Sequence, residues 1–186
     1  MKKLKIASAV VAGALFCFAA TAQDTNSLCT AIGAFEAQAD VILVKGFGNV
    51  GTVPLDAGTL LIRCKETQDL STGTKLYGLA VGLDMGQGGE LRTLVDDDEV
   101  DSLLSAVDYL MKIKDTVTSL PGYEALFTTK AGFRVIAHSD RKEGGANTYV
   151  QFYDSPRIRI SPVQMTQLYN LISIAKKNIE ALKSGK

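Results

Sequence analysis

The sequence predicts an α+β fold in which two tandem β-β-β-β-α units, each an antiparallel sheet with one helix, pack as one pseudo-twofold globule. Two segments, beginning at Arg92 and Arg157, share one pattern: a short extended stretch followed by an amphipathic helix. Alternating segments bounded by glycine-rich turns precede both. The matching apolar helix positions are Val100, Leu103, Leu104 and Val107 in the first and Met165, Leu168, Tyr169 and Ile172 in the second.

The N-terminus has the three parts of a bacterial secretory signal peptide. Three lysines within the first five residues precede the uncharged apolar run Ile6–Ala20. The small residues Ala20 and Ala22 then form a signal-peptidase cleavage site. The run is too short for a membrane span, which needs about 20 apolar residues. Residues 1–22 are therefore predicted to be a signal peptide, and the mature protein is expected to be periplasmic or secreted, with no transmembrane segment.

Composition excludes some classes of partner. The chain holds 20 basic and 20 acidic residues. Signal cleavage removes three lysines and no acid, so the mature chain carries a net charge of −3. A chain without net positive charge lacks the electrostatic footprint of a protein that binds nucleic acid or an anionic membrane. We therefore expect no nucleic acid among its partners.

The mature chain divides at the turn sequence SLPG, which begins at Ser119. The first unit is residues 23–118, with a helical segment near Ser27–Ala37, and the second is residues 119–186. Each helix is expected to lay its stripe on one face of its sheet. The predicted strands are Asp40–Lys45, Thr59–Lys65, Lys75–Asp84 and Glu90–Val95, then Tyr123–Thr129, Gly132–Ser139, Asn147–Tyr153 and Arg157–Ile160.

A run of four acids, DDDE, begins at Asp96 and is interpreted as a helix start. Asp96 and Ser161 are the predicted N-caps of the two helices, and Glu99 and Gln164, three positions later, complete two capping boxes. Pro162 stands at the first helical position, where its missing N–H costs nothing. The acidic helix start complements the helix dipole and is expected to face solvent.

The same acids do not predict a metal site. A calcium loop of the EF-hand type needs acids at alternate positions and a central glycine. Here the acids are consecutive and lead directly into the helix. The sequence therefore predicts neither a metal nor another cofactor.

Two cysteines remain after signal cleavage, Cys29 and Cys64. In an oxidising compartment an even pair suggests a disulfide. Cys64 alternates with Leu60 and Ile62 on the inward face of a predicted strand, and Cys29 shares a helical face with Ile32. A bridge would fasten the N-terminal segment to the sheet, and the alternative is two buried free thiols.

The segment GFGNVGTV, Gly46–Val53, matches the glycine pattern of dinucleotide-binding and kinase phosphate loops. The dinucleotide motif requires a helix to begin inside it, and here Pro54 follows. The kinase motif requires further signatures that the chain lacks. The segment is interpreted as a glycine-rich hairpin or bulge.

His138 is the only histidine and the weakest functional candidate. It lies near the end of a predicted strand, on the face that carries Arg134 and Ile136. A serine hydrolase needs a positioned nucleophile, and the chain has no G-x-S-x-G motif. A zinc site would need suitably spaced partners. The favoured interpretation is a surface histidine, and no catalytic residue is assigned.

The segments KGFGNVGTV, DDDEVDSLLSAVDYLMKI and FTTKAGFRV resemble a group of bacterial secreted proteins without an assigned function. The resemblance covers most of the mature chain and implies an exported, non-enzymatic domain, with no site residues. The β-β-β-β-α order is also similar to the units of whirly-type and PUR-type single-strand nucleic-acid binders. Those proteins use a basic groove and stacking aromatics, so the similarity is one of topology alone.

Three functions follow, in order of preference. The first is an exported, non-catalytic binding or structural domain of the bacterial envelope or periplasm, whose partner is a protein or envelope component. The second is a small-molecule or lipid carrier that uses a cleft between the two halves. The third is a hydrolase that uses His138. A large apolar cavity would favour the carrier, and a hydroxyl or thiol beside His138 would favour the hydrolase.

Overall fold

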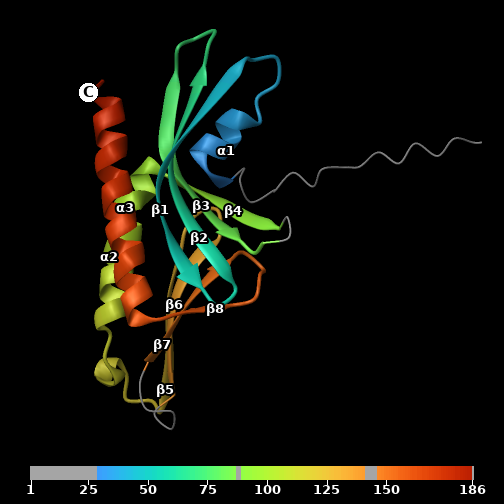
Figure 1. Ribbon diagram of the computed structural model, residues 1–186. Helices are drawn as coiled ribbons and strands as arrows, with labels where there is room; N and C mark the ends of the chain where they lie inside the picture. The colour runs from blue at the N-terminus through green and yellow to red at the C-terminus, as the bar shows by residue number, and fades with distance from the viewer. Residues whose placement is uncertain (1–28, 87–88, 141–145, 186) are drawn as a thin grey trace, which may run out of the picture.

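The computed structural model describes residues 29–86, 89–140 and 146–185 (Figure 1). The predicted signal peptide lies outside these residues. Two antiparallel four-stranded sheets, each followed by a helix, confirm the predicted α+β class. The first sheet has the order β1-β2-β3-β4 and the second β5-β6-β7-β8. The strands are β1 (Leu43–Leu55), β2 (Gly58–Asp69), β3 (Lys75–Asp84), β4 (Glu90–Asp96), β5 (Gly122–Thr128), β6 (Phe133–Asp140), β7 (Ala146–Phe152) and β8 (Ile158–Ile160).

Three α-helices accompany the sheets in the described residues. A short helix, α1 (Ala31–Glu36), precedes β1, and the two long helices α2 (Val100–Lys112) and α3 (Pro162–Lys183) close the two units. Single 3₁₀ turns, η2 (Asp97–Glu99) and η3 (Asp115–Val117), flank α2. Within the described ranges no helix combines the length and the apolar character that crossing a bilayer requires.

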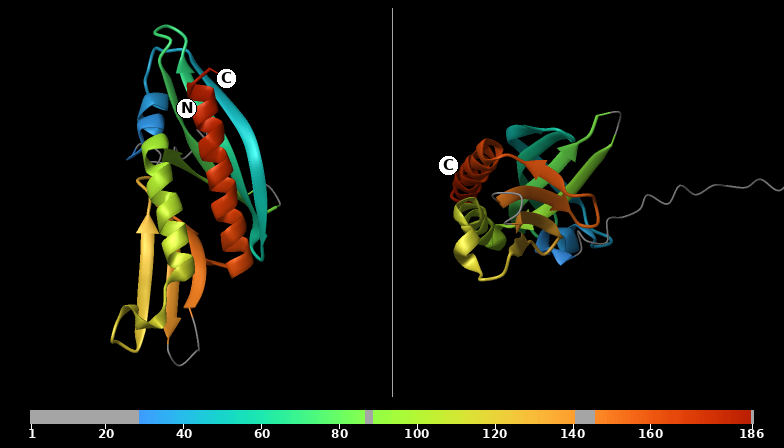
Figure 2. Two further views of the ribbon diagram at one scale, coloured as in Figure 1. Left: turned by 90° about the vertical axis from the view of Figure 1, so that its left-hand side faces the viewer. Right: turned by 90° about the horizontal axis from the view of Figure 1, so that it is seen from below.

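The long helices are exchanged between the units. α3 contacts β1, β2 and β3 of the first sheet, and α2 contacts β5 and β6 of the second. The two helices lie side by side and antiparallel, which Figure 2 shows. The prediction that each helix would cover the sheet of its own unit is therefore wrong. β4 leads into α2 through η2 alone, and only Ser161 separates β8 from α3, so neither connection has the residues for a reversal over its own sheet.

The exchange produces one core. Buried apolar side chains from both sheets and both long helices form a single cluster. The two matched stripes have the same pattern of burial. In each helix three of the four stripe residues are buried, and the remaining one, Leu104 in α2 or Tyr169 in α3, is partly buried. The buried members are Val100, Leu103 and Val107 in α2 and Met165, Leu168 and Ile172 in α3.

Two glycines let helices approach the first sheet closely. A Cβ on Gly51 would lie 2.5 Å from Leu171 Cδ2 of α3, and a Cβ on Gly78 would lie 2.6 Å from Ile32 Cδ1 of α1. Gly51 follows a β-bulge in β1, so the glycine-rich segment is a bulged strand and not a hairpin. Gly78, Ala80 and Gly82 give one face of β3 a smooth surface, because their side chains are small or absent. Here α1 covers that face, and Ile32 packs on Ala80 and Leu94.

Candidate functional site

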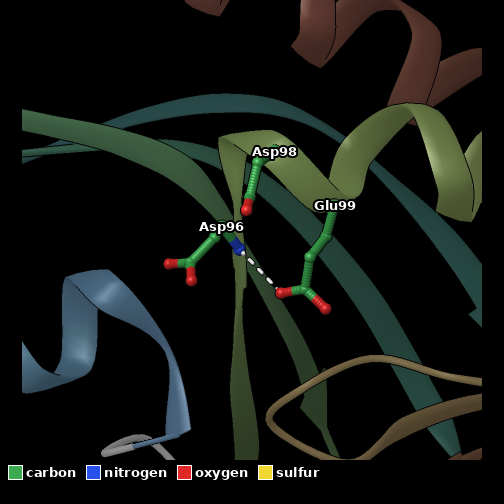
Figure 3. Close-up of side chains that lie close together, drawn as sticks. All are labelled: Asp96, Asp98 and Glu99. Atoms are coloured by element: carbon green, nitrogen blue, oxygen red, sulfur yellow. Dashed lines mark hydrogen bonds between the residues drawn. The ribbon is translucent and has the colours of Figure 1, made fainter.

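Asp96 connects two helices. It occupies the N-cap position of η2, and its N–H donates to Glu99 Oε2 at 3.2 Å. Its carboxylate turns toward α1 (Figure 3) and accepts the N–H groups of Ala31 and Ile32, at 2.7 and 3.1 Å. Ser161 accepts from Gln164 N, and Ser161 N donates to Gln164 Oε1. The Asp96 carboxylate therefore holds the first turn of α1, which lies far from Asp96 in the sequence. The residues around Asp96 in the sequence do not indicate this contact.

Asp96, Asp98 and Glu99 bring carboxylate oxygens within 4.8 Å of one another. The ammonium group of Lys130 forms ion pairs with this cluster: its Nζ lies 2.9 Å from Asp98 Oδ1 and 3.4 Å from Asp96 Oδ2. The N–H of Lys130 also donates to Glu99 Oε1 at 2.7 Å. The cluster thus joins the first sheet to the β5–β6 turn. The closeness of three carboxylates is not by itself evidence of a metal site.

The acidic start of α2 faces solvent as expected, since the side chains of Asp98 and Asp101 are 73 % and 71 % exposed, and it also pairs with α3. Lys176 forms an ion pair with Asp101, and Lys183 forms one with Asp97. The acids at the start of α2 and the lysines toward the end of α3 each favour the dipole of their own helix, and the antiparallel packing brings these opposite charges together as ion pairs.

Replacing Asp96 by alanine is expected to lower the free energy of unfolding by about 2–3 kcal/mol, because charge-assisted hydrogen bonds to the α1 amides are lost at a buried site. Urea unfolding of both variants measures this. Asp98→Ala is the matched control: its side chain is 73 % exposed, so we expect a loss below about 1 kcal/mol. Equal losses in the two variants would contradict the anchoring role of Asp96.

The predicted Cys29–Cys64 disulfide is not present. Both thiols are free; Cys29 is exposed and Cys64 is buried. Cys64 Sγ lies 3.5 Å from the carbonyl oxygen of Ala175 in α3, whereas α1, which follows Cys29, covers the other face of the sheet. The alternation of side chains along β2 correctly predicts that Cys64 faces inward. The helix that Cys64 contacts there is α3, not the N-terminal helix that follows Cys29.

Only one of these thiols is expected to react in the native protein. Burial raises the pKa of the Cys64 thiol, and a thiol in an apolar site reacts slowly. In protein that begins at Gln23, we expect one equivalent of thiol reagent to react natively and two after denaturation. Cys29→Ser should abolish the native reaction. Mass spectrometry of an intact Cys29–Cys64 bridge would contradict the described arrangement.

His138 lies on the outer face of the second sheet, and its side chain is 43 % exposed. Its Nδ1 lies 3.9 Å from Glu124 Oε2, a carboxylate that also binds Arg157 at 2.7 Å. Among the described residues Nδ1 has no hydrogen-bond partner. Ser139, the next residue, points the other way and donates to Asp115. In the described ranges, therefore, no hydroxyl or thiol forms a hydrogen bond with His138 Nδ1, and the Ser139 hydroxyl is directed elsewhere.

A basic pocket lies on the outer face of the first sheet, next to the end of α1. We define it by Lys45 and Phe47 of β1, Lys65 of β2, Arg92 of β4 and Glu36 of α1. The cavity has a volume of about 240 Å³, and Thr93 and Leu94 complete its lining. Of its four charged side chains three are cationic, so the pocket carries a local excess of positive charge in a chain that has none overall.

Lys65 is the unusual member of the basic pocket. Its side chain is only 4 % exposed, and its Nζ lies 2.8 Å from Glu36 Oε1 and 4.6 Å from the centre of the Phe47 ring. Lys45 Nζ binds the other oxygen of Glu36 at 2.8 Å, and Thr67 donates to Oε1 at 2.6 Å. A buried ammonium needs such partners because desolvation is costly.

The pKa shifts reflect this geometry. Burial lowers the pKa of Lys65, opposed by its bond to Glu36, and the positive charges of Lys45 and Arg92 lower it further. Burial raises the pKa of Glu36, but hydrogen bonds from Lys45 and Lys65 outweigh it, so the pKa lies below its ordinary value. Perturbed groups gathered in one pocket are typical of functional sites.

Sequence reasoning missed the basic pocket. Its residues come from α1 and three strands, and none forms a motif. One signal was present: in β2, Leu60, Ile62 and Cys64 alternate with Arg63, Lys65 and Thr67. That pattern predicts a charged outer face, but not that α1 buries Lys65 there.

The junction of the two halves holds an open cavity of about 340 Å³. Its lining is mostly polar and combines Asp56 of the β1–β2 turn with β7, β8 and the start of α3, including Asn147, Arg159 and Gln164. Beside it the halves share the single apolar core. This cavity therefore lacks the apolar lining that a lipid carrier requires.

Comparison of the chain with protein-family models, with curated proteins and with solved structures found no match.

Proposed function

We propose that the chain is an exported, non-catalytic binding domain of the bacterial envelope or periplasm, and that the basic pocket holds an anionic group of its partner. The observation that carries the proposal is Lys65, an ammonium group only 4 % exposed, placed among two further cations and one carboxylate. Glu36 pairs with Lys45 and Lys65, and Glu90 pairs with Arg92. Three cations against two carboxylates leave an excess of positive charge that an anion would neutralise.

The other pocket residues support the same class of ligand. Phe47, 47 % exposed, offers an apolar surface under the cations. Arg92 has a planar guanidinium suited to two parallel hydrogen bonds with a carboxylate, and it is held by Glu90 at 3.1 Å. Export is supported by the basic start, apolar run and cleavage site within residues 1–22.

The carrier alternative is supported less well. The cavity between the halves is lined mainly by polar groups, which suits a small polar molecule better than a lipid. The basic pocket is smaller than this cavity, but it contains the buried ammonium group of Lys65. We therefore prefer it as the binding site.

Titration with N-acetylglutamate, followed by amide NMR, tests anion binding. We expect salt-sensitive shifts at Phe47, Lys65 and Arg92, with a dissociation constant on the order of millimolar for so small a probe. Lys65→Met should abolish them. Lys112→Met is the control, because Lys112 is 71 % exposed and pairs with Asp108 on α2, away from the basic pocket. Absent shifts, or shifts that survive in Lys65→Met, would overturn the binding proposal.

Export has a separate test. Protein made with its full N-terminus in a bacterial host should be recovered from the periplasm or medium beginning at Gln23, because cleavage follows Ala22. Mass spectrometry of the intact protein measures this. A cytoplasmic product that retains Met1 would refute export without affecting the pocket.

A further inference from the structure

β1 is an edge strand, and half of its length is open. Among the strands of the described ranges it pairs only with β2. From the bulge onward α3 covers it, since Leu171 approaches Gly51 and Gln164 Nε2 donates to the carbonyl oxygen of Pro54 at 2.5 Å. Before the bulge, residues 44–49 are exposed. Natural proteins usually blunt so long an edge, because its free main-chain groups can pair with another strand.

The hydrogen-bond pattern shows which main-chain groups are free. Leu70 N donates to the carbonyl oxygen of Ile42 at 3.0 Å, so Ile42 and Leu70 form a hydrogen-bonded pair. Such pairs alternate along an antiparallel ladder. Leu43, Lys45 and Phe47 therefore turn their N–H and C=O groups away from β2, toward the open edge.

The same residues face the basic pocket. Side chains alternate along a strand, and Lys45 and Phe47 lie on the outer face of the sheet with Lys65. A strand added at this edge would place every second side chain beside them. On the other face, Val44 is 49 % exposed, while Gly46 and Gly48 contribute no side chain that could obstruct an apolar neighbour.

We infer that the occupant is an extended acidic segment of a partner protein, which adds to β1 at residues 43–49 as a fifth strand of the first sheet. Acidic side chains at alternate positions meet Lys45 and the rim of the basic pocket, and apolar ones lie beside Val44. This inference rests on the proposed function and specifies its ligand. Main-chain pairing supplies affinity in such complexes, and alternate side chains supply specificity.

Charge selects this occupant over a second copy of the chain. Two copies joined antiparallel through β1 would form one continuous sheet with both basic pockets on the same face. The Lys45 side chains would then approach each other, and like charges on adjacent strands are destabilising. An acidic segment meets the opposite charge at the same positions.

The probe is an acetylated octapeptide in which glutamate and valine alternate. We expect it to bind and to slow hydrogen exchange at the Lys45 and Phe47 amides. Lys45→Gln, which removes only the charge, should weaken binding a few-fold. Lys45→Pro also removes an outward N–H without touching the β1–β2 ladder, and it should weaken binding by about a further tenfold. Thermal unfolding checks that both variants are folded.

Two further peptides keep the test independent of the variants. A peptide of the same composition with its glutamates in one block, and the alternating peptide with all amides methylated, should both bind about tenfold more weakly. Equal binding of all three would overturn strand addition while leaving anion binding intact. If N-acetylglutamate also fails to bind, the proposed function falls as well. A concentration-dependent dimer that competes with the peptide would make a second copy the occupant and overturn the inference.

Discussion

Residues 23–118 alone are expected to be unfolded, and so are residues 119–186, whereas the two fragments mixed in equal amounts should regain the native fold. Each fragment contains a complete β-β-β-β-α unit, but α3 covers the first sheet and α2 covers the second. Separation exposes the inner face of both sheets, with Leu60, Ile62, Val135 and Ala137 among the side chains that lose burial. A unit of this size without its helix has too little core.

Amide NMR of each fragment and of the mixture measures this. Because the interface is a core divided in two, we expect the fragments to associate with micromolar or tighter affinity. The control is the full chain cut by a protease at a site inserted near Ser119, which should stay folded at neutral pH. A dispersed spectrum from either fragment alone would contradict the reciprocal exchange of helices.

Glu36→Ala is expected to lower the free energy of unfolding by about 3 kcal/mol, because it leaves Lys65 as a buried ammonium without its carboxylate. Removing both charges should cost much less: a buried pair replaced by apolar groups of similar size is often neutral. Glu36→Leu combined with Lys65→Met is therefore expected to recover most of the loss. Denaturant unfolding of the two variants and the wild type completes the comparison. A double variant as unstable as Glu36→Ala would show that the loss does not arise from the unpaired charge.

The same ion pair predicts a pH dependence. The folded protein holds the pKa of Glu36 below its ordinary value of 4.5, so its stabilising effect is complete above the pKa of the unfolded chain. It is lost as the pH falls through the lower folded value. Thermal unfolding between pH 7 and pH 3 should show this acid-dependent loss in the wild type, and Glu36→Gln should lose correspondingly less. Parallel curves for the two proteins would rule out Glu36 as its source.

The basic pocket illustrates why the fold was easier to predict than the site. Helix stripes and strand alternation are local patterns, and the structure confirms both. Lys65, Glu36 and Phe47, by contrast, meet only because α1 crosses the outer face of the first sheet, where Gly78 leaves space for Ile32. The glycines of β3 make room on that face. They did not indicate that α1 is the element that packs there, or that its last residue, Glu36, carries a negative charge.

The sequence by itself determined the order of the elements and the buried face of each long helix, and it left the glycine-rich segment as either a hairpin or a bulge. These features depend on periodicity, caps and turn residues, which act over a few neighbouring positions. Only the tertiary structure decided which sheet each helix covers, that Cys64 meets α3, that Asp96 holds α1 and that Lys65 is buried. An apolar stripe specifies that a helix must be covered, but both sheets offer an apolar face. The direct β4–α2 and β8–α3 connections and the common core select between them.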